Sequence, residues 1–125
     1  MAVRTALPGL CLNLRRARGF LERLIGLMGR TDMAPDQAFL IEGCAAIHTI
    51  GMRMPIDVVF LSEHGVVITV CHAVRPGRIR RCPGAAHTLE LAAGAASRAL
   101  LRPGVTFLFG TSTLSIVSTE LEVQS

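Results

Sequence analysis

A long apolar stretch in the middle of the chain limits the folds that this sequence can adopt. Residues 56–61 read IDVVFL, and Asp57 is the one polar side chain among them. The tetrapeptide SEHG at residues 62–65 is typical of a hairpin turn, because its glycine can take the left-handed conformation. Residues 66–74 then return as an apolar partner strand. Neither strand has a clean polar face, so we expect the hairpin to lie centrally, covered on both sides.

The rest of the chain supplies further short elements. Alternation and short apolar runs predict strands at residues 9–14, 38–42, 47–53, 87–91 and 105–109. Helical periodicity predicts two short helices, near residues 17–29 and 92–101. Six or more strands with two short helices favour a mainly β domain, a β-sandwich or a jelly-roll-like distorted barrel, over a parallel α/β sheet.

The length of 125 residues is typical of a single domain. We expect residues 1–110 to form this β-rich domain. Residues 111–125 are expected to be a C-terminal extension that adds an edge strand or frays. The segment RPGRIRRCPG at residues 75–84 lies between two Pro-Gly pairs, which predicts a surface loop.

Composition argues against several classes of partner. The net charge is +4 and all 13 basic residues are arginine, with no Lys, Trp or Tyr. A basic nucleic-acid binder usually carries lysines or stacking aromatic residues, so we expect no nucleic-acid partner. The longest uncharged run, residues 103–119, contains Pro, Gly, Ser and Thr, which predicts no membrane span. The N-terminal apolar stretch is short for a signal peptide, so we expect a cytoplasmic protein with reduced cysteines.

Metal and cofactor sites are not expected either. The candidate ligands do not fall into C-x-x-C or H-x-x-x-H spacing on one element; they are Cys44, His48, Cys71, His72, Cys82 and His87. The chain also contains no Gly-rich phosphate loop and no nucleophile-elbow pattern. The sequence therefore predicts neither a bound metal nor a cofactor.

Asp57 is the most informative polar residue, because an unpaired carboxylate on an apolar strand costs several kcal/mol. In a structural interpretation it accepts backbone N–H groups and fixes the entry to its strand. In a functional interpretation it is a general base or a ligand anchor in a pocket with His48 and Arg53. Glu90, on another predicted strand, is a second candidate carboxylate.

Four segments in order resemble a known family: RLIGLM at 23–28, CAAIHTIGM at 44–52, PIDVVFL at 55–61 and LELAAG at 89–94. Over about residues 15–104 the chain resembles domain of unknown function 192, an uncharacterised prokaryotic family. The resemblance implies a mainly β, jelly-roll-like sandwich and no catalytic residues, because none are established for the family. Some relatives are exported or lie beside pilus or secretion genes, which implies an accessory role in the cell envelope.

Three functions remain open on the sequence alone. The first is a binding or accessory module that holds a small anionic ligand or a protein partner. It would use a shallow pocket around His48, Arg53 and Asp57, or the arginine loop with Arg78 and Arg80. The alternative is a hydrolase or lyase that uses His48 with Asp57 or Glu90 as acid and base. The third is a scaffold that presents the tail after residue 110.

Overall fold

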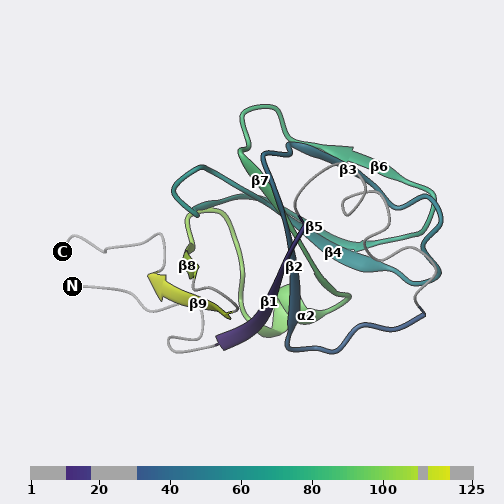
Figure 1. Ribbon diagram of the computed structural model, residues 1–125, viewed down its shortest axis with the longest axis horizontal. Helices are drawn as coiled ribbons and strands as arrows, with labels where there is room; N and C mark the ends of the chain where they lie inside the picture. The colour runs from purple at the N-terminus through teal and green to yellow at the C-terminus, as the bar shows by residue number, and fades with distance from the viewer. Residues whose placement is uncertain (1–10, 18–30, 110–112, 119–125) are drawn as a thin grey trace.

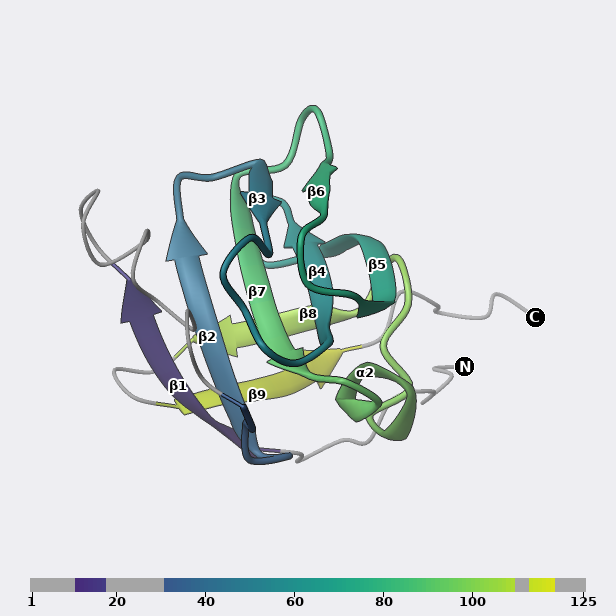
Figure 2. The same ribbon diagram turned by 90° about the vertical axis from the view of Figure 1, so that its right-hand side faces the viewer.

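A mixed β-sheet dominates the computed structural model, which describes residues 11–17, 31–109 and 113–118. Its strands are β1 (Cys11–Ala17), β2 (Gln37–Glu42), β4 (Ile56–Leu61), β5 (Val67–Val74), β7 (His87–Ala92), β8 (Thr106–Phe109) and β9 (Thr113–Ser118). In the described residues these seven strands follow the order β5-β4-β7-β2-β1-β9-β8 (Figures 1 and 2). The pair β1–β2 is parallel and the other pairs are antiparallel. The predicted mainly β fold is confirmed.

Two smaller elements lie outside this sheet. The strands β3 (Ala46–His48) and β6 (Ile79–Arg81) pair with each other in an antiparallel ribbon. The short helix α2 (Ala95–Arg98) follows β7. Figure 2 shows the ribbon at one end of the molecule, with α2 near the other. The ribbon and the helix pack on different faces of β4, and this separation decides which polar residues can meet.

The two outer strands of the sheet approach each other without closing a barrel. The N–H of Val67 donates to the carbonyl of Val105 at 2.8 Å, and the N–H of Phe107 donates to the carbonyl of Gly65 at 2.9 Å. An isolated bridge joins Val66 to Thr106. The sheet therefore curves so that the start of β5 meets β8, and no described strand other than β4 pairs with the rest of β5.

Strand β4 divides the core into two clusters. All six of its residues are buried. Since neighbouring side chains of a strand point to opposite faces, Val59 and Leu61 join a cluster that includes the α2 alanines. Ile56, Val58 and Phe60 join a second cluster with Ile47 of the ribbon. The prediction of a strand covered on both sides is thus correct for β4. It is wrong for β5, which lies at the sheet edge and is partly exposed.

Other predicted elements differ from the structure in instructive ways. The helix expected at 92–101 shortens to α2, since Gly94 adopts a positive φ of 91° before it and Leu100 a φ of 56° after it. The helix expected at 17–29 lies outside the described residues, except for Ala17 in β1. The expected loop at 75–84 contains β6. The expected edge strand or frayed tail contains β9, which lies between β1 and β8 rather than at an edge.

Candidate functional site

Asp57 is completely buried, and its carboxylate accepts three backbone N–H groups. Its Oδ1 accepts the N–H of Ala73 at 2.8 Å, on the far end of β5. Its Oδ2 accepts the N–H of Gly94 at 3.0 Å and that of Ala96 at 2.9 Å, at the start of α2. The first N–H groups of a helix have no partner within the helix. The carboxylate of Asp57, on strand β4, is the acceptor for two N–H groups at the start of α2. Asp57 thereby connects β4, the irregular end of β5 and α2.

The structure does not bring Asp57 together with His48 and Arg53. Asp57 shares a face of β4 with Val59 and points toward α2, whereas the ribbon covers the opposite face. His48 and Arg53 are both exposed. A pocket lined by these three side chains is therefore not formed, and the carboxylate of Asp57 is not accessible to a ligand.

Glu90 is buried on the face of the sheet opposite to Asp57. It lies in β7 between Val58 of β4 and Phe39 of β2, its partners in the two neighbouring strands. Only 2% of the residue is exposed, and no hydrogen bond joins its carboxyl group to another described residue. Burial raises the pKa of Glu90 to about 8. The carboxyl group is therefore mostly protonated at neutral pH, and it does not form a pair with Asp57.

Thr49 attaches the arginine-rich loop to the ribbon. Its side chain is fully buried, its Oγ1 donates to the carbonyl of Arg75 at 2.7 Å, and the same oxygen accepts the N–H of Arg78 at 2.8 Å. Its backbone carbonyl also accepts the N–H of Gly77 at 3.0 Å. One threonine thus fixes residues 75–78 against the turn after β3. The sequence contains it within the segment IHTIGM, but nothing in a lone threonine indicates this role.

We expect Thr49→Val to loosen this loop with little change in side-chain volume. The variant leaves the N–H of Arg78 and the carbonyl of Arg75 without their side-chain partner, which costs about 1–3 kcal/mol. Urea unfolding should report this loss, and limited trypsin digestion should cut faster after Arg78. Thr106→Val is a matched control, because the Thr106 hydroxyl makes no hydrogen bond to a described residue. Equal digestion rates for the two variants would contradict this role of Thr49.

The surface around the ribbon is basic and exposed. His48, Arg53, Arg75, Arg78 and Arg81 are all exposed, and Arg80 is half-buried. The Nδ1 of His48 accepts the N–H of Ile50 at 3.3 Å, which leaves Nε2 to carry the proton of the neutral ring. We call His48, Ile50, Arg53, Arg75, Arg78, Ile79, Arg80 and Arg81 the basic ribbon surface. Of the predicted ligand-binding residues, it contains His48, Arg53, Arg78 and Arg80.

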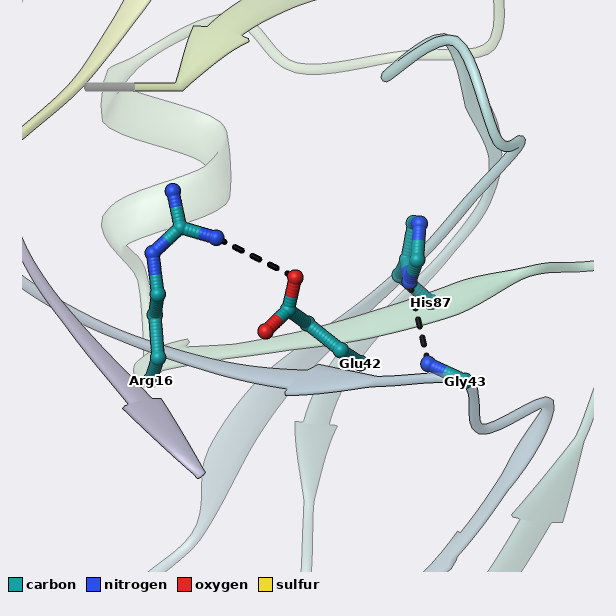
Figure 3. A network of polar contacts seen from close by, with 4 residues as sticks. All are labelled: Arg16, Glu42, Gly43 and His87. Atoms are coloured by element: carbon teal, nitrogen blue, oxygen red, sulfur yellow. Dashed lines mark hydrogen bonds and ion pairs between the residues drawn. The ribbon is translucent and has the colours of Figure 1, made fainter. Parts of the chain in front are cut away.

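Three other candidate metal ligands make hydrogen bonds within the protein: Cys44, Cys82 and His87. Figure 3 shows His87, whose Nδ1 accepts the N–H of Gly43 at 3.0 Å, beside an ion pair of 3.2 Å between Arg16 and Glu42. Burial raises the pKa of the Cys71 thiol, and the charge of Arg80 opposes this shift in part. Within residues 11–17, 31–109 and 113–118, no three His, Cys, Asp or Glu side chains form a group that could hold a metal ion.

The described helix is too short and too polar to cross a membrane, so this part of the structure contains no membrane-spanning helix.

Comparisons with known proteins agree with the fold. The model of the family DUF192, described as an uncharacterised ACR, matches residues 3–109. No curated protein matches the chain. A protein of unknown function from Novosphingobium aromaticivorans aligns with 21% identity and a TM-score of 0.67, over 74% of this chain and 71% of its own. A putative transcription regulator from Sinorhizobium meliloti aligns with 26% identity and a TM-score of 0.70, over 88% and 84% of the two chains.

Proposed function

The chain belongs to the DUF192 family of uncharacterised proteins, and we propose that it is a small binding module. In this proposal an acidic protein partner binds to the basic ribbon surface. The site keeps His48, Arg53, Arg78 and Arg80 from the sequence prediction and leaves out Asp57, whose buried carboxylate accepts three backbone N–H groups.

The distribution of charge carries this proposal. Residues 43–56 and 64–89 contain five arginines and no Asp or Glu. The pairing of β3 with β6 and the hydrogen bonds of Thr49 bring these two stretches together. A surface of one sign attracts ligands of the opposite sign and speeds their encounter. Arginine also pairs carboxylates through two parallel hydrogen bonds.

Exposed apolar side chains favour a protein partner over a small anion. Ile79 is 60% exposed and Ile50 is 54% exposed. Ile50 precedes the bend that contains Arg53, and Ile79 directly follows Arg78. His48 pairs with Ile79 across the ribbon. A small anion would use the arginines alone, whereas an acidic protein segment can also cover the two isoleucines. A small anionic ligand is therefore the second choice.

Two other assignments have less support. A hydrolase or lyase that uses His48 with Asp57 or Glu90 needs the imidazole beside a carboxylate, and no hydrogen bond joins His48 to either one among the described residues. The name of the Sinorhizobium meliloti protein suggests regulation of transcription, which makes DNA a necessary competitor in binding experiments. A cytoplasmic location and an accessory role in the cell envelope, in pili or in secretion stay predictions.

Binding to a tetraglutamate peptide tests the proposal. We expect the peptide to raise the melting temperature, and the double variant Arg53→Gln/Arg78→Gln to bind about tenfold more weakly, since each exposed ion pair contributes about 0.2–1 kcal/mol. Higher salt should weaken binding further. Arg98→Gln is the matched control, because Arg98 is exposed on α2, away from the ribbon.

The proposal is wrong if the double variant binds the peptide as tightly as the wild type does. It is also wrong if a short DNA duplex binds more tightly than the peptide at the same salt concentration. A thermal-shift screen against anionic metabolites covers the second choice, because strong stabilisation by a small anion alone would replace the protein partner in the proposal.

A further inference from the structure

The ribbon has a fixed pattern of backbone hydrogen bonds. The N–H of Thr49 donates to the carbonyl of Arg78 at 2.8 Å, and the N–H of Cys82 donates to the carbonyl of Ala45, also at 2.8 Å. In an antiparallel pair, residues that exchange hydrogen bonds alternate with residues that do not. Thr49–Arg78 and Ala45–Cys82 belong to the first kind, so the pairs of β3 and β6 next to them belong to the second.

This alternation leaves Ile79 and Arg81 with backbone groups directed away from β3. Their partners across the ribbon, His48 and Ala46, form the pairs without hydrogen bonds. No described backbone group bonds to the N–H of Ile79 or to the N–H and carbonyl of Arg81. Both residues are exposed, and Figures 1 and 2 show β6 at the margin of the molecule. The outer edge of β6 is therefore an open strand edge.

One group on this edge is covered by a charged side chain. The Nη1 of Arg80 donates to the carbonyl of Ile79 at 2.8 Å. Charged side chains are a common means of protecting a strand edge from unwanted pairing. A carboxylate is a stronger acceptor for a guanidinium than a neutral carbonyl is. An acidic ligand can therefore take Arg80 away from Ile79, whereas a neutral strand would have to compete with it.

We propose that an extended acidic segment of a partner protein adds to β6 as a third strand of the ribbon. This inference rests on the proposed function and names the way in which the partner binds. A carboxylate of the segment takes the guanidinium of Arg80, and a backbone N–H of the segment takes the carbonyl of Ile79. Backbone carbonyls of the segment accept the N–H groups of Ile79 and Arg81. Strand addition of this kind uses main-chain hydrogen bonds for affinity and alternate side chains for specificity.

The local sequence limits the length and character of the added segment. Pro76-Gly77 and Pro83-Gly84 bracket the strand, so only about three or four residues of the partner can pair with it. Side chains of an extended segment alternate between the two faces. An acidic residue on one face can reach Arg80, and an apolar residue on the other can cover Ile79, of which 60% is exposed and which shares its face with Arg81.

The experiment uses the full chain labelled with ¹⁵N and an eight-residue peptide of alternating Glu and Val. We expect the amide signals of Ile79 and Arg81 to shift on titration. We expect Ile79→Pro to bind the peptide at least about tenfold more weakly, because it removes an N–H that the ribbon does not use. Proline is tolerated on strand edges, and the melting temperature checks that the variant is folded. Ile79→Thr keeps the N–H and should lose less than about threefold.

A second peptide separates strand addition from simple charge attraction. It has the same sequence with an N-methyl group on every residue after the first, which removes the backbone N–H donors of both edges of the peptide and keeps every side-chain charge. If both peptides bind equally well and still depend on Arg53 and Arg78, the strand addition is overturned and the proposed function stands. If Ile79→Pro and Ile79→Thr lose affinity equally, the side chain and not the edge is responsible, which also overturns it. If neither peptide depends on Arg53 and Arg78, the proposed function itself fails.

Discussion

Replacing Asp57 with alanine is expected to lower the free energy of unfolding by roughly 3–5 kcal/mol. The change leaves three buried or half-buried N–H groups without an acceptor, on Ala73, Gly94 and Ala96. Each such group costs about 1–3 kcal/mol when it stays unpaired. Ala73 also has a positive φ of 47°, a conformation that its hydrogen bond to Asp57 helps to hold. Urea unfolding followed by circular dichroism measures the loss.

Asp57→Asn is the informative second variant. One amide oxygen in place of Oδ2 can still accept the N–H groups of Gly94 and Ala96, but the amide NH₂ then faces the N–H of Ala73. We expect a loss smaller than that of Asp57→Ala. Glu63→Ala removes a carboxylate whose side chain is 75% exposed and should change little. If Asp57→Ala unfolds like the wild type and binding is lost instead, Asp57 has a ligand-binding role and the structural interpretation is wrong.

The wild-type protein is expected to become less stable as the pH rises from about 5 to about 8, and Glu90 is the main cause. Burial raises the pKa of this carboxyl group from 4.5 to about 8. Below pH 4.5 both the folded and unfolded states hold the proton. Between the two pKa values only the folded state holds it, so each rise of one pH unit favours unfolding by up to about 1.4 kcal/mol. The stabilisation is fully lost once the pH passes the folded-state value.

Glu90→Gln isolates this contribution, because glutamine is a neutral group of similar shape. We expect the variant to match the wild type near pH 4 and to exceed it by several kcal/mol near pH 8. Glu63→Gln, at an exposed turn position, is the matched control. Unfolding free energies measured across this range for the three proteins make the comparison. Parallel curves for the wild type and Glu90→Gln would show that Glu90 does not titrate in this way.

The sequence predicts the elements that burial determines. In β4 the apolar residues occupy both faces, and the stretch IDVVFL is buried throughout. The sequence allows two interpretations of Asp57, and one of them is a buried carboxylate that accepts backbone N–H groups. Which donors would meet it could not be predicted, because Ala73 and Ala96 come from β5 and α2, 16 and 39 residues away.

The sequence fails where pairing, rather than burial, creates structure. Strand β6 has only one apolar residue, and Ile79 faces outward with 60% of its surface exposed. It is a strand because it pairs with β3, and a three-residue pairing has no periodicity to detect. The separation of Asp57 from Glu90 has a similar origin. Both are acidic residues in buried strands. Strands β4 and β7 pair so that Glu90 lies opposite Val58, the residue next to Asp57, and this register places the two carboxyl groups on opposite faces of the sheet.

The position of β9 beside β1 also determines when this protein can finish folding. Cys11 pairs with Ser115 and Leu12 with Leu114, about a hundred residues apart in the chain. While the ribosome is still making the protein, β9 does not yet exist, and of the two described neighbours of β1 only β2 can pair with it. The pairing of β1 with β9 forms only after residues 113–118 have emerged from the exit tunnel. Completion of the sheet is therefore expected to be a late event of synthesis.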